Sequence, residues 1–496
     1  MQKIFLYNTK TKQKEEFKPL QEWLVKMYSC GPTVYNYAHI WNLRSYIFPD
    51  ILKKTLRLVW YKVEDLINFT DVWHLVSDWD EWEDKMEKKA KEEWKNAWEI
   101  SKFYSEAFKS DLKKLNIWFP KKFSKATDYI QEQIDLVKKL EEKWCTYKTS
   151  DWIYFDTEKF PRYWEFANIK KDELKEWARV DFWEKKNPTD FALWKFSWDS
   201  KRQMEWDAFW QKWFPGWHLE CTAMIFKELW ETIDIHTWWT DHIRVHHTNE
   251  IAQAECATWK NYVNYWLHWE FLILDKKDDS NEKWWKMSKS SWNFITIKTL
   301  EEKWFDPIVY KFFALQNSYR KFLTFSFENL KVAEKNYEKF KSEIKKIFQD
   351  IWNEQKIFSD LKNFSEEFKN YDKKILEKFC DNISTPQVLD LLRKFLKEKN
   401  ISPEEKIFLI KKYDKILWLN LLDFSKLQQH ALACWLDEFS DKIPEEIKIL
   451  IEKRKFFKQE KKFLEADKIK EKIFSLWFEI KDTREWIEIK KYKNIF

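Results

Sequence analysis

Short apolar runs alternate with longer segments of helical period near the N-terminus. Apolar residues dominate 25–30 and 61–67, and a helical pattern covers residues 42–57 between them. A turn at Gly31-Pro32 separates the first run from the helical stretch. Strand, helix and strand in this order form a βαβ unit. The pattern therefore predicts a parallel sheet with a ligand site at the ends of its strands.

Farther along the chain this alternation is interrupted and then resumes. A charged helical pattern covers residues 81–115, and residues 118–225 mix turn signals with short strands, which predicts an insertion. Strand-like residues 232–235 and helical residues 249–257 return to the α/β pattern. After about residue 330 the chain is rich in Lys and Glu, with helical period and few turn signals. That last part predicts a helical bundle.

A chain of 496 residues is too long for one hydrophobic core, so several domains are expected. The predicted fold class is α/β, with a Rossmann-like parallel-sheet domain, an inserted subdomain and an α-helical bundle. The expected divisions are 1–117 and 226–330 for the two halves of the parallel-sheet domain, 118–225 for the insertion, 331–430 for the helical domain and 431–496 for a small C-terminal region.

The composition is unusual in one respect. The chain has 35 Trp and 2 Gly, whereas average usage of about 7% would give roughly 35 Gly. Trp60 and Trp477 each lie between an apolar helical stretch and a strand-like one, where helices commonly end on a left-handed glycine. Trp152 stands where Asp-Gly would form a turn before a strand.

We interpret most of these tryptophans as glycine in the native protein. The expected cause is a codon, UGA, that is read as Trp in conceptual translation and decoded as Gly by the source organism. The alternative is a protein rich in genuine tryptophan, which would place bulky indoles at many turns at once.

Charge and cysteine usage add little that is specific. The 89 basic and 83 acidic residues give a formal net charge of +6, a weak indication of a polyanionic partner. No apolar run approaches a membrane span and the N-terminus lacks the core of a secretory signal, so we expect a cytoplasmic protein without membrane contact. The cysteines show no framework spacing, and either reduced thiols or a metal or catalytic role for some is expected. They are Cys30, Cys145, Cys221, Cys256, Cys380 and Cys434.

Four distant residues form a candidate metal site. His246 and Glu250 are four residues apart on one helical face and can share an ion. Cys30 ends the first apolar run, and Cys221 follows residues 217–220 (WHLE). Two thiolates, one imidazole and one carboxylate suit zinc. Because no local pair of cysteines is present, the alternative that each is an ordinary core or helix residue stays open at this point.

Two separated segments are candidates for a nucleotide site. His39 and Asn42 stand where the helix after the first strand begins, next to backbone N–H groups that favour phosphate. Trp41 between them would fill the space in which adenine approaches the backbone. Lys286 and Lys289 lie on a Ser-containing loop, and two ammonium groups suit a pyrophosphate leaving group. A solvated Lys/Ser turn is the alternative for this loop taken alone.

Read with Gly at position 41, residues 39–42 (HIWN) resemble the HIGH motif of class I aminoacyl-tRNA synthetases, and residues 286–290 match their KMSKS motif in full. Nearly the whole chain is similar, more specifically, to the cysteinyl-tRNA synthetase family. The shared motifs are 30–35 (CGPTVY), 190–195 (DFALWK), 215–221 (PGWHLEC), 246–250 (HHTNE) and 482–486 (DTREW, with Trp for Gly). The family has Trp at the positions of Trp194, Trp206, Trp217 and Trp266. It has or favours Gly at those of Trp41, Trp238, Trp239, Trp284, Trp285 and Trp292.

The resemblance implies ATP-dependent ligation of L-cysteine to tRNA(Cys) through a cysteinyl-adenylate, with ATP and Mg²⁺ as substrate and one Zn²⁺ per chain. The residues that match the family's zinc ligands are Cys30, Cys221, His246 and Glu250. Those that match its catalytic residues are His39, Asn42, Lys286 and Lys289, of which His39, Asn42 and Lys289 bind ATP. Those that would line the cysteine pocket are Thr33, Trp217, His218 and His236. The helical part would bind the anticodon, the last region would contact tRNA, and a monomer is expected.

Two other functions remain to be weighed. A cysteine:amino-sugar ligase is similar through the catalytic half, but it lacks an anticodon-binding part, and the long helical segment after residue 330 disfavours it. A catalytically impaired RNA-binding homologue follows if every Trp is literal.

Overall fold

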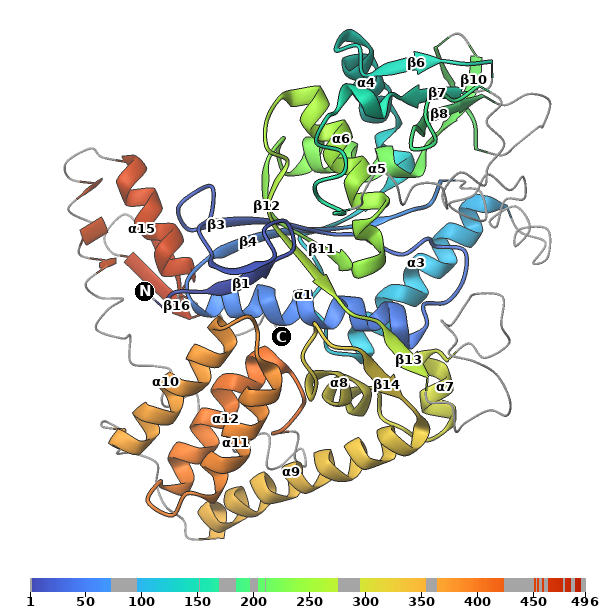
Figure 1. Cartoon of the computed structure of the whole chain (residues 1–496). Coiled ribbons are helices and arrows are strands. Elements are labelled where there is room, and N and C mark those ends of the chain that lie inside the picture. Colours follow the sequence, from blue (N-terminus) through green and yellow to red (C-terminus); the bar gives the residue numbers. More distant parts are fainter. Residues whose placement is uncertain are drawn as a thin grey trace.

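A five-stranded parallel sheet lies at the centre of the molecule (Figure 1). The computed structural model describes residues 2–72, 96–150, 152–168, 184–196, 204–209, 211–274, 295–353 and 364–422, with short stretches between 450 and 491. The strands follow the order β12-β11-β3-β4-β5. Their bounds are Leu24–Ser29 for β3, Lys62–Phe69 for β4, Lys122–Lys125 for β5, Ile233–Trp239 for β11 and Val263–Trp269 for β12.

The point where the strand order reverses lies between β3 and β11. The chain builds outward from β3 through β4 to β5, and later from β11 to β12 on the other side. All four neighbouring pairs are parallel. In open α/β sheets ligands bind at the carboxyl ends of the strands at such a switch point. The predicted parallel α/β sheet is therefore confirmed, and its switch point marks where to look for a site.

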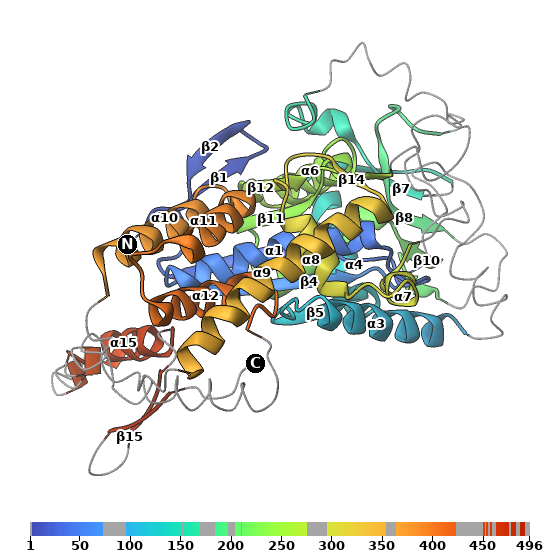
Figure 2. The ribbon, with the colours of Figure 1, turned by 90° about the horizontal axis from the view of Figure 1, so that it is seen from below.

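Helix α1 (Ile40–Leu58) connects β3 to β4 and is buried on nearly every side. It lies between the sheet and the C-terminal helices (Figures 1 and 2). Its charged side chains are therefore paired: Lys53 Nζ lies 2.6 Å from Asp65 Oδ2, and Lys54 Nζ lies 2.6 Å from Asp50 Oδ2. Buried charges are tolerated when they are paired in this way.

Three more helices accompany the sheet. They are α3 (Ala97–Lys114), α5 (Trp217–Glu228) and α6 (His246–Thr258). Helices α5 and α6 pack side by side on the side of the sheet away from α1 (Figure 1). Helix α5 precedes β11 and helix α6 follows it. The N-terminal turns of both helices therefore lie at the carboxyl end of β11, near the switch point.

The inserted part forms a separate antiparallel sheet of order β6-β7-β8-β10-β9. Its strands are β6 (Thr146–Lys148), β7 (Trp152–Phe155), β8 (Phe191–Phe196), β9 (Trp206–Ala208) and β10 (Gln211–Pro215), and α4 (Ile130–Glu142) packs beside it. The predicted start at residue 118 is too early, because β5 pairs with β4 in the parallel sheet. A strand of four residues is too short for its periodicity to show which sheet it joins.

A disulfide joins Cys145 of the inserted part to Cys256 on α6. The expectation of reduced thiols is therefore wrong for this pair. The two residues are 111 positions apart, and no spacing along the sequence reveals that α4 and α6 lie against each other.

The C-terminal part is helical over most of its described residues through 417, as predicted. Its helices are α7 (Ile297–Glu302), α8 (Pro307–Leu315), α9 (Phe327–Asn353), α10 (Glu366–Cys380), α11 (Thr385–Lys397) and α12 (Pro403–Leu417). Helix α15 (Phe463–Ser475) precedes a hairpin of β15 (Phe478–Asp482) and β16 (Ile487–Lys491). Two small pairs, β1 (Phe5–Asn8) with β2 (Gln13–Glu16) and β13 (Leu272–Leu274) with β14 (Leu323–Phe325), complete the described strands. Among the described residues, no helix has both the length and the apolar character needed to cross a bilayer.

Candidate active site

Cys30 follows the last residue of β3 at the switch point, and a network of hydrogen bonds fixes the turn after it. The Gly31 N–H donates to Asn68 Oδ1 at 2.6 Å, and Asn68 Nδ2 donates to Thr70 Oγ1 at 3.3 Å. Thr70 Oγ1 in turn donates to Glu220 Oε2 at 3.1 Å, which ties this turn to helix α5. A Cβ on Gly31 would lie 1.4 Å from the Asn68 carbonyl oxygen, so only glycine fits here.

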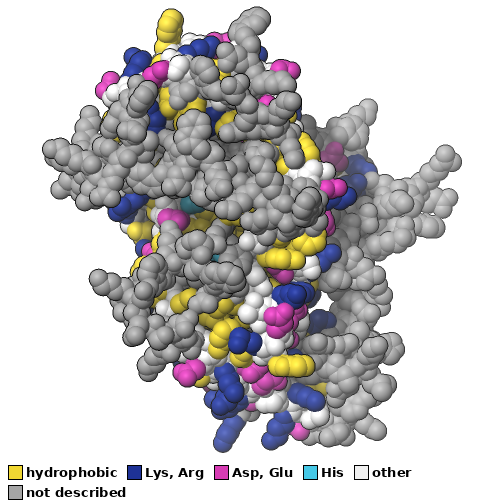
Figure 3. Space-filling model, turned by 90° about the vertical axis from the view of Figure 1, so that its right-hand side faces the viewer, with side chains coloured by type: hydrophobic (Ala, Val, Ile, Leu, Met, Phe, Trp, Pro, Cys, Tyr) yellow, Lys and Arg dark blue, Asp and Glu magenta, His cyan; other side chains and the backbone are white. Residues whose placement is uncertain are grey.

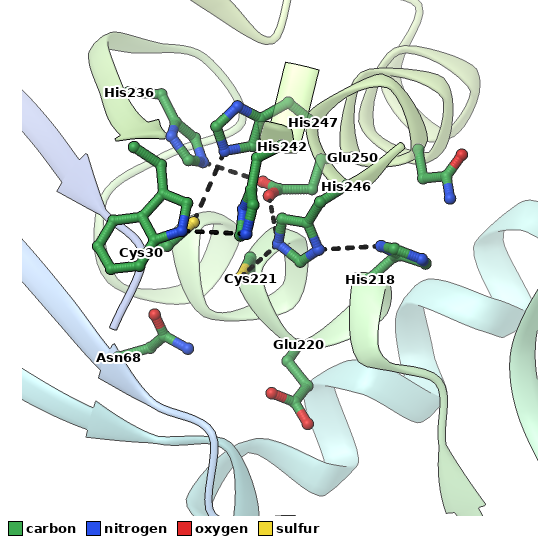
Figure 4. A network of polar contacts seen from close by, with 12 residues as sticks. Cys30, Asn68, His218, Glu220, Cys221, His236, His242, His246, His247 and Glu250 are labelled. Atoms are coloured by element: carbon green, nitrogen blue, oxygen red, sulfur yellow. Dashed lines mark hydrogen bonds and ion pairs between the residues drawn. The ribbon is translucent and has the colours of Figure 1, made fainter. Parts of the chain in front are cut away.

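The four predicted metal ligands come together around one point (Figure 4). One ligand atom from each of Cys30, Cys221, His246 and Glu250 lies within 4.8 Å of all the others, and all four residues are buried. Cys221 Sγ lies 3.5 Å from His246 Nε2, and that nitrogen lies 2.9 Å from Glu250 Oε1. The four side chains are therefore neighbours in the fold, a point that spacing along the sequence left open.

The donor atoms fit a divalent cation. Glu250 Oε1 is buried and close to His246, yet it takes part in no hydrogen bond of acceptable geometry. An ion held by both residues would satisfy this oxygen, which otherwise represents an unpaired buried acceptor. Two sulfurs, one imidazole nitrogen and one carboxylate oxygen are ligands that zinc accepts.

The electrostatics of the four residues follow from their burial and proximity. Burial raises the pKa of the Cys30 thiol well above its usual value. Burial acts in the same direction on Cys221, but hydrogen bonding with Cys30 and the nearby His246 lower the pKa of this thiol. Against burial, the Glu250 carboxylate raises the pKa of His246 to about 10. Also against burial, His236 and His246 lower the pKa of Glu250 to about 2. The cluster therefore favours an ionised Glu250 carboxylate beside a protonated His246, and a bound cation would take the place of that proton.

Further histidines surround these ligands. His236 Nε2 lies 3.1 Å from Glu250 Oε2, and the Tyr262 hydroxyl donates to the same oxygen at 3.1 Å. His247 Nδ1 lies 2.7 Å from His268 Nε2. Cys30, His236, His247 and Glu250 form a second, overlapping set of ligand atoms. We favour the first set, because His236 is already positioned to orient the Glu250 carboxylate, as residues behind metal ligands commonly do.

Three of the four predicted pocket residues lie next to this centre. The Trp217 ring centroid is 4.7 Å from that of His246, and His218 Nδ1 lies 2.9 Å from His246 Nδ1. His236 is fully buried beside Glu250. The fourth, Thr33, forms a bridge with Thr70 on the neighbouring strand connection.

The first nucleotide segment lies at the start of α1. His39 is the N-cap residue, and its Nδ1 accepts a hydrogen bond from the Asn42 N–H at 3.1 Å. The Ile40 N–H donates to the Ile295 carbonyl at 2.9 Å, and His39 forms a bridge with Thr296. Residues a few positions after the KMSKS segment are thus held against residues 39–40. Lys286 and Lys289 themselves lie outside the described residues, and so do Trp284, Trp285 and Trp292.

Aromatic rings fill the region beside the His39 segment. The Trp41 ring centroid is 5.5 Å from that of Trp239 and 5.4 Å from that of Phe271. Trp238 packs against Trp239 at 6.2 Å and against Trp269 at 6.4 Å. All four indoles are buried. The space next to the predicted nucleotide segment is therefore occupied by side chains of the chain itself.

Sequence reasoning missed several residues of this site. His242 lies against Trp217 and His246, and its spacing of four from His246 was a signal that could have found it. His268 and Asn68 follow no motif, and only the pairing of the parallel strands brings them to the site. On the face shown in Figure 3, histidine is visible only as small patches set deep among other atoms, as expected for a buried centre.

Comparisons with known proteins agree with this geometry. A family profile described as "tRNA synthetases class I (C) catalytic domain" matches residues 16–335. A cysteine--tRNA ligase from Treponema denticola is 40% identical over 498 residues, which cover 96% of this chain and 97% of that protein. One from Borrelia garinii is 40% identical over 494 residues, with 98% and 99% covered.

A solved structure shows the same fold at lower identity. Mycobacterium tuberculosis methionyl-tRNA synthetase in complex with methionyl-adenylate has a TM-score of 0.55 and 14% identity, and the match covers 82% of this chain and 86% of that one. The fold is thus that of the class I tRNA synthetases. The profile and the near full-length similarity go further, and the chain belongs to the cysteine--tRNA ligase family.

Proposed function

We propose that this protein attaches L-cysteine to tRNA(Cys) in an ATP-dependent reaction with a cysteinyl-adenylate intermediate. The observation that carries the proposal is the buried quartet of Cys30, Cys221, His246 and Glu250 at the sheet's switch point. A centre with two sulfur ligands is suited to recognising a thiol substrate. Membership of the cysteine--tRNA ligase family supplies the second, independent support.

Zinc is the proposed metal, one ion per chain, held by the four residues of the quartet. When bound, it supplies a site for the thiolate of the substrate cysteine, a bond that a serine hydroxyl or an alanine methyl cannot reproduce. Packing alone would distinguish such similar side chains by only about 1–3 kcal/mol. His236 and Tyr262 hold the second oxygen of Glu250, and Trp217 and His218 border the same space.

The chemistry follows in two transfers. The carboxylate of cysteine attacks the α-phosphorus of ATP, a new P–O bond forms, and pyrophosphate leaves together with Mg²⁺. His39 and Asn42 stand at the positive end of α1 to bind phosphate oxygens, while Lys286 and Lys289 stabilise the charge that grows on pyrophosphate. A terminal ribose hydroxyl of tRNA then attacks the carbonyl carbon of the adenylate and AMP leaves.

The helical part after residue 330 is proposed to bind the anticodon, and the region after 431 is proposed to contact tRNA as well. Four packed helices, α9 to α12, form its described part. On the face shown in Figure 3, lysine and arginine side chains are interspersed with acidic ones at the lower, helical end. We propose a monomer in the cytoplasm, with ATP, L-cysteine and tRNA(Cys) as its partners.

Cysteine-dependent ATP–pyrophosphate exchange and cysteinylation of tRNA together test the proposal. Protein purified from its native source should catalyse both reactions. Exchange without transfer to tRNA would indicate a ligase for another acceptor, such as an amino sugar. The absence of exchange, in a protein shown to bind zinc, would contradict the proposed function and indicate an impaired RNA-binding homologue.

A further inference from the structure

Six tryptophans have a backbone conformation that tryptophan rarely adopts. Only a few per cent of non-glycine residues have positive φ, and Asn, Asp and His are enriched among them. Here thirteen described non-glycine residues have positive φ, and six of them are tryptophans while four are asparagines. The tryptophans are Trp23 (φ 70°), Trp60 (φ 81°), Trp144 (φ 59°), Trp259 (φ 58°), Trp304 (φ 65°) and Trp418 (φ 47°).

Three of these tryptophans end helices through the same hydrogen-bond pattern. At the end of α1, the Trp60 N–H donates to the Arg57 carbonyl at 3.1 Å and the Tyr61 N–H donates to the Leu56 carbonyl at 3.0 Å. This pair of bonds defines a Schellman motif, whose left-handed residue is usually glycine and sometimes asparagine. The same two bonds recur around Trp144 after α4 and around Trp304 after α7.

Helix α3 provides an internal comparison. It ends in the same motif with Asn116 in the left-handed position (φ 49°), where the Asn116 N–H donates to the Lys113 carbonyl and the Ile117 N–H donates to the Leu112 carbonyl, both at 3.0 Å. Asparagine is the residue that tolerates this conformation best after glycine. Among the described helix ends with this motif, those without Asn carry Trp.

The remaining left-handed tryptophans fit the same interpretation. Trp259 and Trp418 end α6 and α12. Trp23 is the third residue of a turn closed by the Leu24 N–H and the Gln21 carbonyl at 3.2 Å, a position that takes Gly or Asn when its φ is positive.

Three of the six side chains also make little use of their size. Trp304 is 92% exposed, Trp144 82% and Trp259 73%, which is unusual for the largest apolar side chain. Indoles that are strained at the backbone and exposed at the ring contribute little to packing. Glycine would remove both defects at once.

We infer that the native residue is glycine at these six positions, and also at Trp41, Trp238 and Trp239. The last three rest on the proposed function, because their indoles occupy the space beside the nucleotide segment. With glycine at these positions, the carboxyl end of β11 and the start of α1 present bare backbone, as close approach of a nucleotide requires. The sequence as written describes a synthetase closed at its nucleotide site, and the native protein is open there.

Peptide mass spectrometry of the protein isolated from its source organism tests all nine positions directly. The expected masses have glycine at each, and they have tryptophan at Trp217 and Trp266, whose rings pack against His246 and His236. Tryptophan masses at the nine positions overturn the inference, whatever the activity of the protein. Glycine masses in a protein without exchange activity would leave the inference standing and contradict the proposed function instead.

A stability series separates backbone strain from loss of the indole. The triple variant Trp60→Gly, Trp144→Gly and Trp304→Gly should unfold at a temperature roughly 2–4 °C above that of the matched triple alanine variant. Both sets remove the indoles, but only glycine removes the Cβ. An alanine triple at least as stable as the glycine triple would overturn the assignment at the helix ends. As a control, Asn116→Ala should lower the unfolding temperature and Asn116→Gly should leave it nearly unchanged.

The nucleotide site is tested in protein expressed as written. The triple variant Trp41→Gly, Trp238→Gly and Trp239→Gly should gain cysteine-dependent ATP–pyrophosphate exchange and ATP binding by calorimetry, relative to the parent chain. A gain in ATP binding without exchange supports the opened site and counts against the proposed reaction. ATP binding that is equal in the two proteins would overturn the inference for these three positions.

Discussion

The two halves of the site differ in how completely the chain as written builds them. On the metal half, the ligand atoms of Cys30, Cys221, His246 and Glu250 lie within 4.8 Å of each other, and neighbouring histidines orient them. On the nucleotide half, His39 caps α1 correctly, yet Trp41 and Trp239 fill the space beside it. Both halves lie along one edge of the same sheet.

The difference teaches which kind of motif depends on glycine. The metal half uses side-chain chemistry, and its two close backbone approaches are at Gly31 and Gly216, the two glycines that the sequence retains. A Cβ on Gly216 would lie 2.1 Å from the Ala192 carbonyl oxygen. By our inference, the nucleotide half requires bare backbone at several further positions, so tryptophan in place of glycine would close it while leaving the metal half intact.

Replacing a candidate metal ligand should have a large effect on the metal half of the site, both on bound zinc and on activity. Cys221→Ser should lose bound zinc and reduce cysteine-dependent exchange by more than about 100-fold, since even residues behind the ligands are worth 10–100-fold. Zinc content by elemental analysis and the KM for cysteine measure the effect. Cys380→Ser is the matched control, because Cys380 is a buried free cysteine on α10 outside the quartet. Unchanged zinc content in Cys221→Ser would contradict the proposed set of zinc ligands.

The nucleotide half should respond to loss of its proposed ammonium group. In the glycine-containing protein, Lys289→Ala should slow adenylate formation by roughly 100- to 1,000-fold while leaving cysteine binding nearly unchanged. Single-turnover exchange and cysteine titration separate the two quantities. Lys298→Ala is a suitable control, because Lys298 is an exposed lysine just after that loop. An exchange rate that matches the parent would remove Lys289 from the mechanism.

A substitution of a residue that contacts a candidate ligand should show how much the surrounding side chains contribute to zinc affinity. His236→Phe removes the partner of Glu250 Oε2, so zinc affinity should fall by about 10–100-fold. Competition with a chelator gives this value. Tyr262→Phe removes only the second donor to the same oxygen and should have a smaller effect. If both variants bind zinc like the parent, His236 does not support the site, and the second set of ligands, which contains His236, is excluded as well.

The last expected effect is on stability, and it concerns the helix that carries the nucleotide half. Burial, partly opposed by Asp50, lowers the pKa of Lys54 on α1 to about 7 from its usual value of 10.5. The unfolded chain therefore binds more protons than the folded one between these values, and folding stability should rise with pH there. The free energy of unfolding of the parent, relative to Lys54→Met, should increase by about 1.4 kcal/mol per pH unit from pH 7 to 10. Denaturant unfolding at several pH values measures this slope, and a flat difference would contradict it.

The architecture followed from patterns that the sequence states directly, whereas the full set of four candidate metal ligands rested on the family resemblance. The period of residues 42–57 and the spacing of His246 and Glu250 follow from local geometry. Two features could not be read in this way. The short strand β5 has too few residues to show its sheet, and the Cys145–Cys256 pair depends on how α4 and α6 pack. The contacts of Asn68 and His268 likewise exist only once the parallel strands are in register.

The turn at Trp23 has a practical consequence for anyone who produces this protein. Trp23 is the first left-handed tryptophan of the chain, and it stands just before β3 begins. If its codon is UGA, a laboratory host that reads UGA as a stop will release a peptide that ends before any strand of the parallel sheet. A synthetic gene with glycine codons at these positions is then needed for a full-length product, while a gene with UGG codons would yield a long chain whose ATP site is closed.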